Sequence, residues 1–443
     1  MRNTFIGMTA VLLCWHGATA LAGLLEGTEA YQAGQYRMAM HELKPLAVGG
    51  DAQAQSMVGH MYVSGHGVAR NYALGAQWLQ KAAAQGDASA QFRLAEMYAN
   101  GQGVAQNYAE AAKWYRQSAA HGGALEQFNL GMMFYNGRGV SADDREAAEW
   151  FRRAADLESM QARYMLGWMY EKGRGVAHDD EAAAAWYNQA ADQGYVEAQG
   201  RLCEMYYQGR GVEQDFTAAM SWCRKAGEQG DANAQVRIGR MYQEGEGVIQ
   251  DYALALSWYR KADGSGNASA QRHIGWLYQQ GLGVARDDGE ALLWYRKAAE
   301  QGDALAQFRT GKIYSRGPGR DPDKTLWWYR KSSAQGNAEG QSGLGELYLR
   351  GEGVTQNFDE ARRLFELAAE QGLARAQYNL GSMYEHGYGM DADLLLAHMW
   401  YNLAGIAGDQ AAVTQRKEIE GRMTAGQIEK AQAMASAWLE AHR

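Results

Sequence analysis

The sequence predicts an all-α fold, an α/α superhelical solenoid of about ten helix-turn-helix repeats of 36 residues. Pairs of glycines recur with this period from Gly65 onward, and Asn or Asp residues do so from Asn71 onward. Tryptophans keep the same period at Trp78, Trp114, Trp150, Trp186, Trp222, Trp258 and Trp294. A fixed period of this length indicates repeated supersecondary units that stack on one another.

The second repeat shows why each unit should be a pair of helices. Ala90, Leu94 and Met97 are spaced three or four residues apart, which is the apolar stripe of an amphipathic helix. Gly101 follows, and glycine favours the left-handed conformation that ends helices. Asn107 is then the expected N-cap of a second helix. Two such short helices bury their apolar faces only when the repeats stack in series.

These positions together resemble the Sel-one-like repeat, a relative of the tetratricopeptide repeat. The shared pattern is A-x-A-Q-x-x-L-G-x-x-Y-x-x-G-x-G-V-x-x-D-Y-x-x-A-x-x-W-Y-x-K-A-A-x-x-G, and it covers residues 52–409. The resemblance implies a right-handed solenoid that mediates protein–protein interaction. It also implies a bacterial protein of the periplasm or the extracellular space, since members of the family are often exported.

The chain divides into four predicted parts. Residues 1–22 look like a signal peptide, with a short apolar segment too short to span a bilayer and small residues before cleavage after Ala20 or Ala22. Residues 23–51 are expected to form an N-terminal capping helical hairpin, and residues 52–409 the ten repeats. Residues 410–443 are expected to form C-terminal capping helices. The alternative for the first part is a membrane anchor.

Two of these junctions depart from the repeat. The third repeat ends at Leu157-Glu158-Ser159, where other repeats have Gln-Gly. The eighth is two residues short and carries Pro318, Arg320 and Pro322 in its loop. We expect distorted junctions there, with a tolerated loop variant as the alternative.

Composition and motifs argue against several functions. The net charge of −8 offers no general attraction to nucleic acid. The ten histidines are scattered and make no zinc-protease pair, and the glycine loops follow helices rather than strands, so we predict no metal, no cofactor and no catalytic residue. A weak β-lactamase-like activity, known among cysteine-rich relatives, would need Ser-x-x-Lys, which does not occur. The sequence therefore predicts a protein that is not an enzyme.

The two cysteines beyond the predicted signal peptide lie in the fifth repeat. Cys203 occupies a small-residue position of the first helix, held elsewhere by Gly59 or Gly131. Cys223 replaces an aromatic residue of the second helix. A large-to-small and a small-to-larger change in one repeat indicates that the two sites face each other. We predict a Cys203–Cys223 disulfide, with two buried thiols as the alternative.

A binding surface is predicted from positions that vary among the repeats. By analogy with tetratricopeptide solenoids, the first helices line the concave side, and their sixth and ninth positions are free of the packing pattern. Large apolar and basic residues at and beside these positions indicate a basic, aromatic-lined groove for an acidic peptide, a carboxylate or an anionic glycan. The predicted partner-binding residues are Met132, Trp168, Arg201, Arg237, Arg240, Arg272, His273, Trp276, Arg309 and Lys312. The alternative is solvated charge, with tryptophans packed against neighbouring repeats.

With an enzyme disfavoured, the sequence leaves two other classes of function open. The first is an exported scaffold, expected to be monomeric, that binds a protein or peptide through its concave surface. The second is an accessory protein of cell-wall or exopolysaccharide processing that contacts a glycan or a synthase. Aromatic side chains suit sugars as well as peptides, so the sequence alone does not separate the two.

Overall fold

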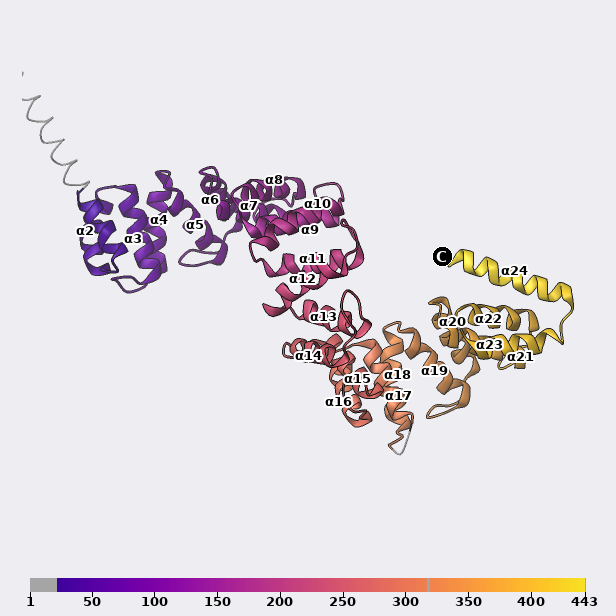
Figure 1. Cartoon of the computed structure of the whole chain (residues 1–443). Coiled ribbons are helices and arrows are strands. Elements are labelled where there is room, and N and C mark those ends of the chain that lie inside the picture. The colour runs from indigo at the N-terminus through magenta and orange to yellow at the C-terminus, as the bar shows by residue number, and fades with distance from the viewer. Residues whose placement is uncertain (1–21, 317–318, 443) are drawn as a thin grey trace, which may run out of the picture. The chain divides into compact units, whose positions relative to one another are not determined.

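A computed structural model describes residues 22–316 and 319–442. These residues form helices joined by short turns, with no strand among them (Figure 1). The chain forms two compact units, the first ending at Lys225 and the second beginning at Ala226. The predicted all-α solenoid is thereby confirmed. The predicted signal peptide lies, except for Ala22, outside the described residues.

Each repeat contributes two helices. Within each unit, a first helix packs against the second helix of its own repeat and that of the repeat before it. The first helices of the first unit are α3 (Ala52–Ser64), α5 (Ala88–Asn100), α7 (Ala124–Asn136), α9 (Met160–Lys172) and α11 (Val196–Gln208). Their second helices are α4 (Tyr72–Ala84), α6 (Tyr108–Ala119), α8 (Asp144–Asp156), α10 (Asp180–Asp192) and α12 (Phe216–Glu228), whose last three residues belong to the second unit. In this way α9 packs on both α10 and α8.

The second unit continues the same alternation. Its first helices are α13 (Ala232–Glu244), α15 (Ala268–Gln280), α17 (Ala304–Tyr314), α19 (Ala338–Arg350) and α21 (Ala374–His386). Its second helices are α14 (Tyr252–Asp263), α16 (Asp288–Glu300), α18 (Pro322–Ala334), α20 (Phe358–Glu370) and α22 (Leu394–Ile406). Here α15 packs on both α16 and α14. The terminal segments form helix over residues 22–32, then α2 (Tyr36–Val48), α23 (Gln410–Glu420) and α24 (Ala425–Ala441).

The helix ends follow the predicted capping pattern. The side chain of Asn107 accepts hydrogen bonds from the backbone N–H groups of Ala109 and Glu110, at 3.0 and 3.1 Å. First helices of the repeats end at a glycine in the left-handed conformation, except α17. That helix stops two residues early, and Ser315 caps it in the right-handed helical conformation. Pro318 lies outside the described residues. The predicted distortion of that loop is therefore seen only in the early end of α17 before it.

The junction after the third repeat keeps the usual turn, so the expected distortion there is wrong. Glu158 adopts a φ of 65°, in the left-handed region where the other repeats have glycine. The backbone N–H groups of Leu157 and Ser159 still donate to Ala154, as in the regular turns. Replacing glycine with Glu158 therefore leaves the turn intact but strains the backbone of Glu158, because its Cβ disfavours a positive φ.

In the fourth repeat the residue after the tryptophan, rather than the tryptophan itself, forms the core, whereas Trp114, Trp258, Trp328 and Trp400 of other repeats are buried as well. Tyr187 is fully buried, whereas Trp186 is half-buried. A Cβ placed on Gly167 of α9 would lie 2.6 Å from the Tyr187 ring, which confirms the close helix approach expected at this small position. Buried glutamines join successive repeats, as where Gln199 donates to the Ala191 carbonyl at 3.2 Å.

Candidate functional site

The sixth and ninth positions of the first helices form what we term the first-helix face. The predicted partner-binding residues lie on this face, except Arg272 at the adjacent fifth position of α15, and they divide between the two units. Met132, Trp168 and Arg201 belong to the first unit. The second unit holds Arg237, Arg240, Arg272, His273, Trp276, Arg309 and Lys312.

Four of the residues in the second unit line one pocket of about 190 Å³, which we term the α15–α17 pocket. It contains no carboxylate among its lining residues, and its basic side chains come from α15 and α17. The lining residues are Gln243, Arg272, His273, Trp276, Tyr295, Leu305 and Arg309.

The two arginines of this pocket differ in their partners. Arg272 donates from Nε to Asp303 Oδ2 at 3.1 Å and from Nη2 to Ser269 at 3.2 Å. Arg309 is half-buried, and within residues 22–316 and 319–442 it makes no hydrogen bond or ion pair with its side chain. A half-buried guanidinium without an acidic partner is available to a carboxylate that comes from outside.

His273 contributes packing to this pocket rather than charge. Its ring stacks on Tyr259, with the ring centroids 4.8 Å apart. Burial, together with the positive charges of Arg272 and Arg240, lowers the pKa of His273 to about 3. The ring is therefore neutral at pH 7, and the sequence-based count of His273 among the basic residues is wrong.

Trp276 forms the apolar wall of the α15–α17 pocket. It is half-buried and packs against two core clusters, one of which contains Tyr259 of the sixth repeat and the other Ala306 of the eighth. The predicted slot is therefore only partly open to solvent. Of the remaining basic residues, Arg240 pairs with Glu244 at 3.4 Å, and Lys312 lines a neighbouring pocket on the other side of α17.

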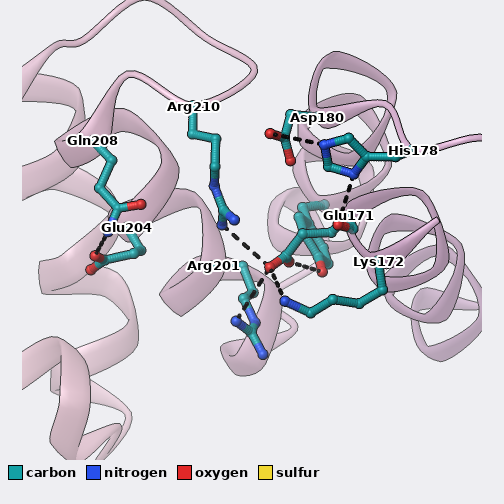
Figure 2. A network of polar contacts seen from close by, with 9 residues as sticks. Glu171, Lys172, His178, Asp180, Arg201, Glu204, Gln208 and Arg210 are labelled. Carbon is teal, nitrogen blue, oxygen red and sulfur yellow. Dashed lines mark hydrogen bonds and ion pairs between the residues drawn. The ribbon is translucent and has the colours of Figure 1, made fainter. Parts of the chain in front are cut away.

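In the first unit, three basic side chains converge on one buried carboxylate (Figure 2). The carboxylate belongs to Glu171, whose side chain is 1% exposed. Its Oε1 lies 2.9 Å from Lys172 Nζ, 3.3 Å from Arg210 Nη2 and 3.8 Å from Arg201 Nη1. Tyr187 donates to its Oε2 at 2.8 Å.

These contacts keep Glu171 ionised despite its burial. Burial alone would raise the pKa of Glu171, but hydrogen bonds from Lys172 and Tyr187 and the charges of Arg201 and Arg210 lower it overall. Arg201, which the sequence assigned to the binding groove, therefore already has a carboxylate from the preceding repeat.

The two apolar residues predicted in the first unit pack against its core. Met132 and Trp168 are both half-buried there. Trp168 meets Tyr135 edge to face at 5.7 Å, and the Arg174 guanidinium lies 5.6 Å from the Trp168 ring centroid. Each of these residues leaves only part of its side chain for a ligand.

Cys203 and Cys223 are joined by a disulfide between α11 and α12, with their Cα atoms 4.8 Å apart. They occupy the positions at which Gly167 meets Tyr187 one repeat earlier. The bond thus stands where the other repeats have a glycine–aromatic contact. Whether the thiols are oxidised in the cell stays a prediction.

Sequence reasoning missed an interaction that recurs at the twelfth position of the repeat. In the fourth, sixth, seventh and tenth repeats, the residue there accepts a hydrogen bond from the buried tyrosine of the second helix. Gln243 accepts from Tyr259 at 2.9 Å, and Glu385 accepts from Tyr401 at 2.9 Å. Comparing two columns of the repeat would have found it, because a repeat with Phe365 in place of tyrosine has the apolar Leu349 at the twelfth position.

Within the described ranges, no group of three His, Cys, Asp or Glu side chains is arranged to hold a metal ion. None of the helices in the same ranges has the length and apolar character needed to span a bilayer.

The stacked helical hairpins define a helical-repeat solenoid. The Sel1 repeat model matches ten successive segments: residues 52–87, 88–123, 127–159, 161–195, 196–231, 232–262, 268–303, 304–337, 338–373 and 374–409. The chain belongs to the Sel1 repeat family, and the resemblance stated from the sequence is confirmed.

Two solved structures are similar to most of this chain. One is a protective antigen of uropathogenic Escherichia coli strains with an SLR fold, 35% identical, with a TM-score of 0.88 over 95% of this chain and 92% of that one. The other is a Sel1 repeat protein from Oxalobacter formigenes, 34% identical, with a TM-score of 0.58 over 70% of this chain and 90% of that one. No curated protein matches the chain.

Proposed function

We propose that this protein is a non-catalytic scaffold that binds an acidic segment of a partner protein through the first-helix face of its second unit. Its fold is that of a family whose repeats serve as scaffolds. The observation that carries the proposal is Arg309, a half-buried cation without an acidic partner in a pocket lined by no carboxylate. Packing does not require a cation there, because Gly343 and Asn379 hold the equivalent position in later repeats.

The test places a photo-cross-linking amino acid at Leu305, which lines the α15–α17 pocket, and separately at Leu293, which is 48% exposed on α16. In extracts of the native organism, we expect partner cross-links from position 305 and none from position 293. Charge reversal by Arg309→Glu with Lys312→Glu should remove the cross-link.

The matched control reverses two exposed cations of the C-terminal helices, Lys417→Glu with Lys430→Glu, and should leave the cross-link unchanged. Cross-linking that persists after reversal of Arg309 and Lys312, or that occurs mainly from Leu293, would contradict the proposal.

We further propose that the protein acts outside the cytoplasm. The pattern of residues 1–22 supports this, as does the pairing of Cys203 with Cys223, because disulfides persist in oxidising compartments. Cell fractionation with N-terminal sequencing should find a chain that starts at Leu21 or Gly23 in the periplasm or the medium. A cytoplasmic chain that retains these residues would contradict it.

A further inference from the structure

A second pocket, which we term the α17–α19 pocket, lies on the other side of α17 and has a volume of about 210 Å³. It exists because two small residues, Ser342 and Gly343, take the fifth and sixth positions of α19. In five other repeats the fifth position carries an aromatic ring, and that of Phe308 packs on Tyr329 with the ring centroids 5.4 Å apart. The early end of α17 at Tyr314 removes a further part of the wall.

Two cations of this pocket have no acidic partner. Lys312 and Arg316 make no side-chain hydrogen bond or ion pair with any residue in the described part of the chain. Burial, followed by the positive charges of Arg309 and Arg316, lowers the pKa of Lys312. These charges repel one another, and a bound anion would relieve the repulsion.

A hydroxyl in the same pocket also lacks a partner. Ser342 is 1% exposed, and its Oγ is buried without a hydrogen bond among the described residues. A buried hydroxyl without a partner destabilises the fold, and a ligand oxygen that accepts its hydrogen bond would remove that cost. The pocket thus combines two free cations with a free hydroxyl donor.

The carboxylates that line the pocket are mostly committed to other cations. Glu346 pairs with Arg375 at 2.5 Å, and Glu352 lies 2.9 Å from Arg320. Glu339, in the first turn of α19, makes no ion pair within residues 22–316 and 319–442. Its negative charge acts to raise the pKa of Lys312, against the effect of burial and of the neighbouring arginines. It is the one feature of the pocket that would weaken the binding of an anion.

The two pockets flank a single helix. Arg309 faces the α15–α17 pocket and Lys312, one turn further along α17, faces the α17–α19 pocket. Their centres are therefore separated by roughly the thickness of a packed helix, about 10 Å. A chain in the extended polyproline II conformation rises about 3.1 Å per residue and has three residues per turn. Side chains three residues apart therefore lie on one face about 9 Å from each other, which matches this separation.

We propose that the two pockets together bind one extended acidic segment of a partner, with one carboxylate at Arg309 and a second, three residues away, at Lys312 and Arg316. This inference rests on the proposed function and names the ligand more closely. Charge complementarity and the spacing of the pockets favour two side-chain carboxylates on one strand over a single anion.

The test measures the affinity of acetylated and amidated peptides with two aspartates separated by zero to five serines, by calorimetry at low salt. The peptide with two intervening serines should bind about tenfold more tightly than the others and than a one-aspartate peptide, since one added charge-assisted hydrogen bond is worth about that factor. All two-aspartate peptides carry the same charge, so the preference reports geometry.

Variants assign the two contacts. Lys312→Gln with Arg316→Gln should abolish the preference for spacing, so that the two-aspartate peptides bind no more tightly than the one-aspartate peptide. Arg309→Gln should weaken both peptides, and Glu339→Gln should tighten the two-aspartate peptide about threefold. Lys417→Gln with Lys430→Gln serves as the control, and circular dichroism melting verifies that each variant is folded.

The outcomes separate this inference from the proposed function. Binding of one aspartate through Arg309 without any effect of spacing would overturn the two-pocket inference and leave the proposed function standing. Failure of every peptide to bind would overturn both. A uronic-acid oligomer that outcompetes every peptide would also overturn this inference, because it would make an acidic glycan the ligand.

Discussion

Repeats four and seven contain the same tyrosine contact but differ in the group that accepts it. Tyr187 donates to Glu171 at 2.8 Å in repeat four, and Tyr295 donates to Gln279 at 3.1 Å in repeat seven. Both acceptors satisfy the tyrosine hydroxyl, so the packing of the two repeats is alike. The difference is that only the glutamate carries a negative charge.

That charge decides the state of the arginine on the following repeat. Arg201 is the sixth residue of α11, the first helix of the repeat that follows Glu171, and its guanidinium lies 3.8 Å from the Glu171 carboxylate. Arg309 is the sixth residue of α17, the first helix of the repeat that follows Gln279, and it has no ion pair in the part of the chain that the structure describes. A carboxylate at the twelfth position thus occupies the next arginine, whereas an amide leaves that arginine for a partner.

The largest expected effect comes from removing the internal carboxylate. Glu171→Leu leaves three cations and the Tyr187 hydroxyl without their acceptor, and breaking a buried ion pair in this way costs about 4 kcal/mol. Hydrogen–deuterium exchange should show the loss in α9, α10 and α11, because coupling in a solenoid passes between neighbours. Protection that stays at the wild-type level would mean that the cations do not depend on Glu171.

The matched variant Glu171→Gln retains the acceptor for Tyr187 and removes only the charge. Because the pKa of folded Glu171 lies below that of an unfolded glutamate, its charge stabilises the fold above pH ~4.3 and the effect is lost as the pH falls through the lowered pKa. The difference in unfolding free energy between wild type and Glu171→Gln should therefore shrink below pH ~4.3. A difference that grows on acidification would contradict the assignment.

The next largest effect on stability concerns the disulfide of the first unit. The Cys203–Cys223 bond joins residues 20 apart, and its reduction should lower the free energy of unfolding by about 3 kcal/mol. Urea denaturation with and without reductant measures it.

Cys203→Gly with Cys223→Tyr restores the glycine–aromatic pair of the other repeats and provides the control. This variant should be insensitive to reductant. Two titratable thiols in the unreduced wild-type protein would show that the bond does not form.

A smaller effect tests the comparison directly. Gln279→Glu should give Arg309 an internal carboxylate, as Glu171 does for Arg201, and keep the acceptor for Tyr295. We expect binding of the one-aspartate peptide to weaken about tenfold, equal to about 1.4 kcal/mol, with thermal stability unchanged. Unaltered affinity in Gln279→Glu would show that the twelfth position does not control the arginine.

The smallest effect belongs to the turn before the Glu171 repeat. Glu158→Gly should raise the free energy of unfolding by about 1 kcal/mol, because glycine adopts a φ of 65° without the clash of a Cβ. Glu158→Ala provides the control and should gain much less. A destabilised Glu158→Gly protein would indicate that the glutamate side chain stabilises the junction.

The sequence by itself determined the repeat and its local chemistry. Helix ends and helix packing impose local requirements, such as the N-cap at Asn107 and the small residue at Gly167. These requirements recur every 36 residues, so the sequence alone reveals them. The facing positions of Cys203 and Cys223 follow from the same register.

Only the tertiary structure decided which of the predicted binding residues remain available. Arg201 is occupied by a glutamate from the preceding repeat, His273 is neutral through burial, and Arg272 pairs with Asp303. Charge in a sequence adds up regardless of position, whereas charge in a fold is cancelled by neighbours about 30 residues away. Arg309 and Lys312 remain open because the residues that would neutralise or cover them are an amide and two small side chains.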